Sequence, residues 1–182
     1  MPYFASGPIC PDLPAPAVLD VRLAPDPVLS TPATEVDPRD PAVVELAAGL
    51  IATMRACAGC VGLAAPQVGV SARLFCLDVG GHRKARSYAG LVVLANPVVV
   101  SSAEPQRARE GCLSVPDLTG DVVRAGRIEV AGVVPGSGRP ERYVADAFEA
   151  RAFQHELDHL DGLLFLDRVA GVAAVHARKR YL

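Results

Sequence analysis

The sequence lacks the features that would place the protein in a membrane or on a nucleic acid. Its apolar runs, such as residues 91–95, are short, whereas a membrane-spanning helix needs roughly 18 apolar residues. No long run of basic residues is present, the ARKR at 177–180 being short, and the formal net charge is −2. A nucleic-acid-binding face needs concentrated positive charge. The sequence therefore predicts no membrane segment and no direct nucleic-acid-binding face.

The sequence also predicts neither a secretory leader nor a disulfide framework. The start of the chain is rich in proline and has no basic stretch ahead of an apolar one. The cysteines are odd in number, five, and scattered along the chain, which does not suit a set of paired disulfides. We therefore expect a cytoplasmic protein, whose free thiols can serve as metal ligands or nucleophiles.

The composition is that of one globular domain. The 182 residues are 51% hydrophobic and 21% charged, and a chain of this length can bury its own core. Nine of the 16 prolines fall within the first 40 residues. We expect a proline-rich N-terminal arm over residues 1–18 and a single catalytic domain over residues 19–182.

Hydrophobic periodicity predicts two helices. The first covers about residues 41–58, with Asp40 as its N-cap and a proline at its first position. The second begins after Asp146, where Glu149 three residues later completes a capping box, and it runs to about Leu160. The second helix carries most of the chemistry discussed below.

Four segments are rich in apolar and β-branched residues and are bounded by glycine or proline, as strands are. The last two flank a Gly-Ser-Gly turn and predict a hairpin. Strands that precede one strong late helix favour an α+β fold. The four predicted strands are residues 72–79, 91–100, 122–134 and 139–145.

The strongest local motif is QHELDHLDG at residues 154–162, which contains H-E-x-x-H. On a helix His155 and His159 share one face, so their imidazoles can bind the same metal ion. Glu156 projects from an adjacent direction, within reach of a water at that ion. A metal lowers the pKa of water and a carboxylate beside it moves the proton, so the motif predicts a metal-dependent hydrolase.

Two imidazoles leave the metal site incomplete, because catalytic sites usually have three protein ligands. The chain has no glutamate after Glu156, and Phe165 stands where a third histidine would extend the motif. The third ligand should therefore lie upstream, among the cysteines and His82. The C-x-x-C at Cys57–Cys60 suits a structural zinc site or redox exchange. Cys112 is flanked by glycine, an acid and a hydroxyl in EGCLS.

A third segment, GLAAPQVG at residues 62–69, is rich in small residues. It lacks the spacing and the lysine of a phosphate-binding loop. Its small residues permit close approach of the backbone, and Gln67 offers a neutral amide donor that can stabilise an oxyanion. A tight turn packed against a strand would explain the segment equally well.

Taken together, GLAAPQ, EGCLSVP and QHELDHLDG closely resemble the motifs of the peptide deformylase family, in the same order and in a chain of similar size. The resemblance runs from about Val21 to Arg168. The family removes the N-formyl group from the initiator methionine of nascent polypeptides and releases formate. The implied fold is α+β, with antiparallel β-sheets surrounding a central metal-binding helix.

The resemblance also implies roles for individual residues. Glu156 would be the general acid/base, and Gln67 with the backbone N–H of Leu113 would stabilise the oxyanion. The implied metal ligands are Cys112, His155 and His159.

Substrate contacts follow from the same resemblance. The backbone at Val61, Gly62 and Gly111 would bind an extended peptide. Glu110 would brace the site, and Phe148 would form a wall of the methionine pocket. The substrates would be N-formyl-methionyl nascent peptides at the ribosome.

The resemblance further implies one divalent metal ion. This ion would be Fe2+ in the cell, with Ni2+, Co2+ or Zn2+ as substitutes, and mixed thiolate and imidazole ligation does not by itself select among them.

Three positions depart from the family pattern and bear on substrate preference. Cys60 replaces the usual first glycine of the G-x-G that begins the first motif. Thr119 stands where an arginine is often found, which leaves contact with the far end of the substrate open. Arg151 replaces a commonly apolar residue near the methionine pocket.

Two other functions remain alternatives. A metallopeptidase would use the same water chemistry with a larger acyl pocket. A binding module stabilised by zinc would leave Cys112 free, because its metal would be held by Cys57, Cys60, His155 and His159.

Overall fold

The computed structural model describes residues 16–169 and 171–178, so most of the expected arm at 1–18 lies outside the described residues. The helices are α1 (Pro41–Ala56) and α2 (Ala147–Leu160). The strands are β1 (Gly62–Ala64), β2 (Leu74–Leu77), β3 (Val92–Cys112), β4 (Val115–Val133), β5 (Pro140–Asp146) and β6 (Val175–Ala177). Short 3-10 helices cover Pro27–Ser30, Ala65–Val68, Phe165–Arg168 and Val172–Ala174.

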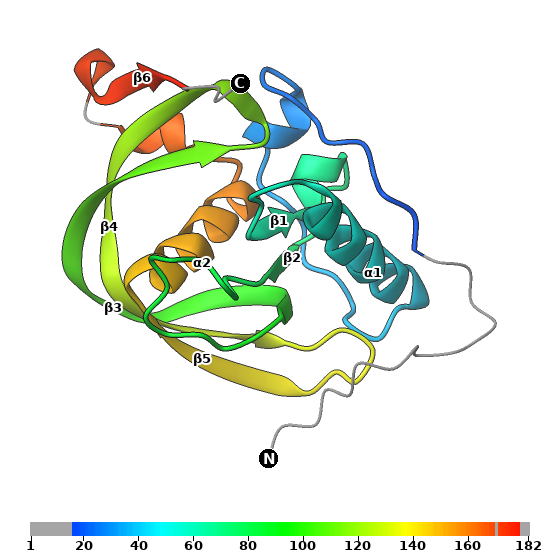
Figure 1. Cartoon of the computed structure of the whole chain (residues 1–182). Coiled ribbons are helices and arrows are strands. Elements are labelled where there is room, and N and C mark those ends of the chain that lie inside the picture. The colour runs from blue at the N-terminus through cyan, green and yellow to red at the C-terminus, as the bar shows by residue number, and fades with distance from the viewer. Residues whose placement is uncertain (1–15, 170, 179–182) are drawn as a thin grey trace.

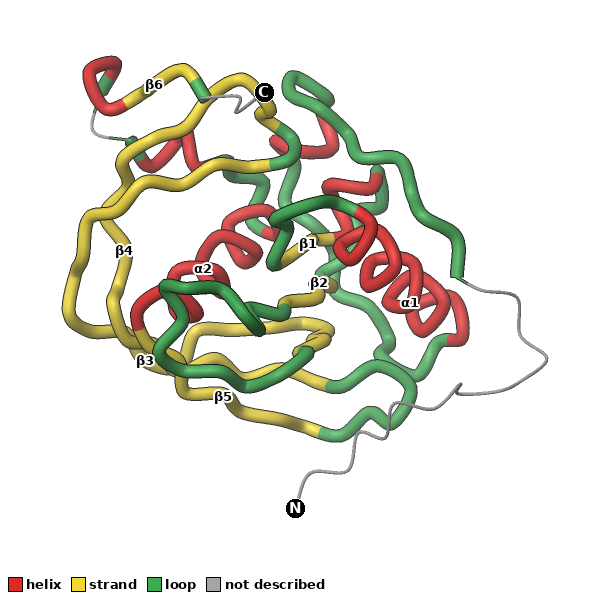
Figure 2. Tube along the Cα trace, viewed as in Figure 1, coloured by secondary structure: helices red, strands yellow, loops and turns green. Residues whose placement is uncertain are grey.

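Within the described residues, one antiparallel sheet has the order β1-β2-β3-β4-β5, and β6 pairs with β4. The long hairpin of β3 and β4 bends around α2, while β1, β2 and α1 lie on the other side of that helix (Figure 1). Figure 2 shows β6 beside the beginning of β4. The α+β fold with a central helix is therefore confirmed.

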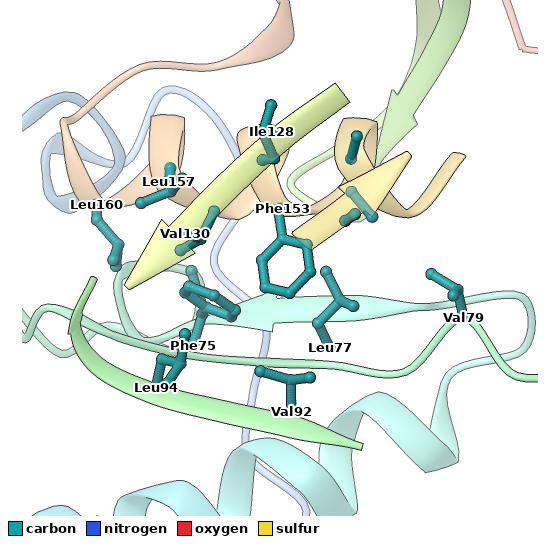
Figure 3. Close-up of a cluster of buried hydrophobic side chains, with 14 residues drawn as sticks. Phe75, Leu77, Val79, Val92, Leu94, Ile128, Val130, Phe153, Leu157 and Leu160 are labelled. Atoms are coloured by element: carbon teal, nitrogen blue, oxygen red, sulfur yellow. The ribbon is translucent and has the colours of Figure 1, made fainter. Parts of the chain in front are cut away.

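The core forms where α2 packs against the sheet (Figure 3). Phe153 is fully buried, and its ring meets that of Phe75 edge-on at 5.9 Å between centroids. Leu157 and Leu160 lie on the same face of the helix as Phe153 and belong to the same buried cluster as Ile128 of β4. Each such side chain contributes about 1.5–3 kcal/mol by leaving water, so the core fixes the helix that carries the H-E-x-x-H motif.

The first helix follows the sequence prediction closely. The side chain of Asp40 accepts a hydrogen bond from the Ala42 N–H and so caps the helix at Pro41. Leu50 and Met54 pack against β1 and β2, where Cys76 is fully buried as part of the core. The helix ends at Ala56, and Gly59 adopts a positive φ of 75° in the turn that follows.

The capping box predicted at the start of α2 is wrong. The Asp146 side chain instead accepts from the Ser87 N–H at 3.1 Å, and Glu149 accepts from the Ala89 N–H at 2.8 Å. Tertiary hydrogen bonds to the loop between β2 and β3 have replaced the local ones. They tie that loop to the helix, beside the pocket described below.

The strand expected at residues 91–100 belongs to a much longer one, β3. Residues 98–107 are exposed, so no hydrophobic alternation marks this half of the strand in the sequence. The expected hairpin at 122–134 and 139–145 is confirmed as parts of β4 and β5.

In the described part of the chain, no helix has the length and apolar character needed to cross a membrane.

Candidate metal centre

Three potential ligands from two elements meet at the centre of the fold. His155 and His159 lie on one face of α2, with ring centroids 5.0 Å apart. Cys112 ends β3, and its Sγ lies 3.2 Å from Nε2 of His159. One ligand atom from each residue lies within 4.8 Å of the other two. A four-coordinate metal with ligand bonds of 2.0–2.3 Å requires ligand atoms about 3.3–3.8 Å apart, so this group fits a metal ion.

Glu110 orients the first histidine. Its Oε2 lies 3.0 Å from Nδ1 of His155, which leaves Nε2 of that ring to face Cys112. Arg124 binds both oxygens of Glu110, at 2.6 and 3.0 Å. Burial acts to raise the pKa of Glu110, but the hydrogen bonds from His155 and Arg124 lower it to about 2. The carboxylate therefore stays charged and fixes the imidazole, as outer partners of metal ligands do.

The electrostatics favour a positive charge between the ligands. Burial acts to lower the pKa of His155, but its hydrogen bonds with Cys112 and Glu110 raise it to about 10. The His155 imidazole thus holds a proton when no ion is bound, whereas burial lowers the pKa of His159 well below its usual value. A divalent cation would supply the same positive charge and displace that proton, which is further support for the fit of a metal.

Glu156 lines the same pocket as His155 and Cys112 and is 3% exposed. Burial raises its pKa to about 7, the range in which a carboxylate can both accept and return a proton near neutrality. Within the described residues, its Oε2 atom has no hydrogen-bond partner. Glu156 therefore has a free oxygen in the pocket for proton transfer.

Gly62 makes room for the Glu156 carboxylate. A Cβ added at Gly62 would collide with Oε1 of Glu156. We expect Gly62→Ala to push the carboxylate aside, because a side-chain end moves more easily than a strand. Misplacement of about 1 Å costs on the order of 100-fold in rate. Steady-state kinetics should show that loss in kcat with metal content unchanged, and an equal loss of metal would contradict this account.

Gln67 presents its amide to the metal centre. Its Oε1 accepts from the Ala64 N–H at 3.0 Å, which turns Nε2 toward Cys112 Sγ at 3.4 Å and Ser114 Oγ at 3.3 Å. The side chain is 2% exposed. The Gln67 amide is thus held in place beside the ligands. Leu113, the residue after Cys112, lines the same pocket.

The pocket beside the ligands has a volume of about 500 Å³. Phe148 forms part of its wall, stacked on His82 with centroids 3.8 Å apart. Gly111 and Gly62 of β1 line the same pocket, and β1 is the end strand of the described sheet. The Val61 carbonyl accepts a hydrogen bond from the N–H of Asp78, which directly follows β2. Because successive residues of an antiparallel strand point their backbone groups alternately to its two sides, the N–H and carbonyl of Gly62 face the unpaired edge of β1.

Cys60 also lines the pocket and its Sγ donates to the Gly62 carbonyl at 3.1 Å. Burial raises the pKa of Cys60 to about 12, so it remains a thiol. Among the described residues, the group suited to a metal is Cys112 with the two histidines, and neither Cys57 nor Cys60 belongs to it. The closed zinc site with four ligands from the C-x-x-C and the histidines is therefore not supported.

Arg151 lines the pocket beside the ligands, but its charge is bound by other groups of the protein. Its guanidinium donates to Glu110 Oε1 at 2.8 Å and to the carbonyls of Gln106 and Val122 at 3.0 and 3.3 Å. The sequence predicts a role for it in substrate preference. The structure instead makes it a second cation that holds Glu110 opposite Arg124.

We expect Arg151→Met to destabilise the protein, because the buried Glu110 carboxylate loses a charged partner while side-chain volume is nearly kept. The expected loss is about 1.5–3 kcal/mol in the free energy of unfolding, measured by urea denaturation of metal-loaded protein. Arg107→Met is the control, since Arg107 is exposed and its ion pair lies on the surface. Equal stability of both variants would contradict a role for Arg151 in holding Glu110.

Two residues near the centre escaped sequence reasoning. Arg124 joins Glu110 to Asp158 of α2, with Nη1 2.7 Å from the Asp158 carboxylate. Arg178, after β6, lies against the Cys112 carbonyl. Arg178 belongs to the short basic segment at 177–180, but nothing in the local sequence around either arginine points to the metal centre, because the contacts depend on the pairing of distant strands.

Comparisons with known proteins agree on one family. The model of the family "Polypeptide deformylase" matches residues 18–174. A peptide deformylase from Halothermothrix orenii is 43% identical over 155 residues, which cover 85% of this chain and 96% of the relative.

Solved structures give the same result. The crystal structure of peptide deformylase from Thermotoga maritima has a TM-score of 0.76 and 36% identity, and the match covers 85% of this chain and 99% of that one. A peptide deformylase from Acinetobacter baumannii with Met-Ala-Ser bound has a TM-score of 0.75 and 32% identity, with 85% and 99% covered.

Proposed function

The chain belongs to the peptide deformylase family, so it is a metal-dependent hydrolase that removes the N-formyl group from nascent polypeptides, and from this premise we propose which of its residues perform the reaction. Cys112, His155 and His159 hold the metal, and Glu156 is the general acid/base. The observation that carries this assignment is that Cys112, His155 and His159 bring their ligand atoms within 4.8 Å of one another, and that Glu156 lines the same pocket as Cys112 and His155.

A divalent ion bound by these ligands supplies Lewis acidity toward water and the formyl oxygen. Glu156 accepts a proton from the water that attacks the formyl carbon, and later donates it to the leaving amine. The Gln67 amide and the Leu113 N–H donate to the oxygen on which negative charge develops, and one such donor is typically worth about 10²–10³ in rate. Glu110 and its two arginines keep His155 in the ligating orientation.

The peptide itself contacts the walls of the pocket. The backbone at Val61, Gly62 and Gly111 binds the extended peptide chain. Phe148 forms a wall of the space for the methionine side chain. A solved relative with Met-Ala-Ser bound supports this class of ligand. The natural substrates are nascent chains that begin with formyl-methionine, met at the ribosome in the cytoplasm.

Fe2+ is the metal we propose for the cell, with Ni2+, Co2+ or Zn2+ able to replace it. The ligand set of one thiolate and two imidazoles suits all four ions. We further propose that residues 19–182 form the catalytic domain and residues 1–18 a separate arm.

The direct test is release of formate from formyl-Met-Ala-Ser by protein loaded anaerobically with Fe2+. We expect turnover with this substrate and none with the internal bonds of unformylated peptides. Cleavage of internal bonds without formate release would favour a metallopeptidase. Cytoplasmic and ribosomal association can be tested separately by fractionation of cells and of ribosomes.

A further inference from the structure

The pocket at the metal centre is lined by four cations, of which two each form an ion pair and two, within the described residues, form none. Arg151 is bound by Glu110, and Arg109 donates to Asp121 at 3.0 Å. Among the described residues, Lys84 and Arg178 take part in no ion pair. The charged residues of the lining are Lys84, Arg109, Glu110, Arg151, Glu156 and Arg178.

Arg178 reaches the pocket from the C-terminal end of the described chain. The preceding strand, β6, pairs with β4 and places His176 opposite Thr119. The Arg178 N–H donates to the Asp117 carbonyl at 2.8 Å, and His176 lies 3.2 Å from the Asp121 carboxylate. These contacts fix the backbone from which the Arg178 side chain extends.

The guanidinium of Arg178 covers the end of β3. Its Nη1 donates to the Cys112 carbonyl at 3.3 Å and to that of Pro116 at 3.5 Å. A Cβ added at Gly111 would lie 2.6 Å from Nη2. The absence of a side chain at Gly111 thus lets the guanidinium lie directly beside the backbone that we propose binds the peptide.

The hydrogen bonds of Arg178 leave part of its binding capacity unused. Both acceptors lie farther from Nη1 than is usual for an N–H···O hydrogen bond, and within the described residues neither Nε nor Nη2 has an acceptor. An arginine presents its donors as a rigid planar fork, which suits carbonyl and carboxylate oxygens. Arg178 lines the pocket that we propose receives the peptide, so a bound peptide can supply the missing acceptors.

We propose that Arg178 determines specificity for the peptide chain beyond the methionine, by donating to main-chain carbonyl oxygens of the residues that follow it. This inference rests on the function proposed above. Phe148 precedes His155 by seven residues on α2, about 10 Å along the helix axis, whereas Arg178 lies against Cys112. The methionine side chain and the following residues are therefore bound by different walls, and the two contributions can be separated.

The test compares substrates of two lengths, formyl-Met methylamide and formyl-Met-Ala-Ser amide, with metal-loaded enzyme. We expect Arg178→Ala to raise KM for the longer substrate about tenfold, equivalent to about 1.4 kcal/mol, with kcat changed by less than about threefold. KM for the short substrate should be unchanged. For the longer substrate, the KM of Arg178→Lys should lie between those of the unmodified enzyme and Arg178→Ala, because lysine keeps the positive charge but loses the planar fork of donors.

Arg142→Ala is the matched control, because it also removes one positive charge but from an exposed ion pair on β5. Calorimetric titration with Met-Ala-Ser should show the same weakening for Arg178→Ala, without any turnover. An unchanged KM for the longer substrate, or an equal rise for both substrates, would overturn the proposal. Failure of the proposed function would look different, since the unmodified enzyme would then release formate from neither substrate.

Discussion

Glu156→Gln should retain metal and lose nearly all turnover. Glutamine fills the same space, so the helix and the ligands beside it stay in place, but an amide cannot accept and return a proton. The loss of a positioned acid/base typically costs about 10²–10⁴ in rate. We expect kcat for formate release to fall by that amount while elemental analysis shows an unchanged metal content.

The chain offers a close control for this variant. Glu149 lies on the same helix, is fully buried and, like Glu156, has one oxygen without a hydrogen-bond partner among the described residues. Its other oxygen binds the Ala89 N–H, away from the metal ligands. Glu149→Gln should therefore keep its activity. If Glu156→Gln kept more than about a tenth of the original kcat, roughly 1.4 kcal/mol of barrier, Glu156 would not be the essential acid/base.

The parts of the structure that sequence predicts are those set by local chemistry. The cap at Asp40 and the histidine spacing on α2 depend on residues within a turn or two of each other. The capping box at Asp146 failed for the opposite reason, because Ser87 and Ala89 outcompeted the local N–H groups. A helix start can be recognised from sequence, but the partners of its side chains cannot be when a distant loop folds over it.

The third metal ligand shows the same limit. The residues alone left several cysteines open, and only the resemblance singled out Cys112, because its approach to His159 depends on how the β3–β4 hairpin bends around α2. The exposed half of β3 has no periodicity from which that hairpin could be predicted. Arg178 is 66 residues from its partner Cys112, so its place in the pocket follows only from the pairing of β6 with β4.

Cys112→Ser should remove most of the metal. A neutral hydroxyl is a much poorer ligand than a thiolate, and serine would leave two imidazoles to hold the ion. Loss of an outer hydrogen-bond partner of a ligand already costs about 10–100-fold in affinity, so loss of a direct ligand should cost more. Elemental analysis after gel filtration measures the retained metal, and circular dichroism checks that the fold is kept.

The other cysteines near the pocket distinguish ligation from a general effect of thiol loss. Cys60→Ser removes a thiol that donates to the Gly62 carbonyl and that a hydroxyl can replace, and Cys57 is half-buried outside the ligand group. Both variants should bind metal normally. Metal lost from Cys57→Ser or Cys60→Ser but kept by Cys112→Ser would instead indicate a zinc-stabilised binding module, in which Glu156 would have no catalytic role.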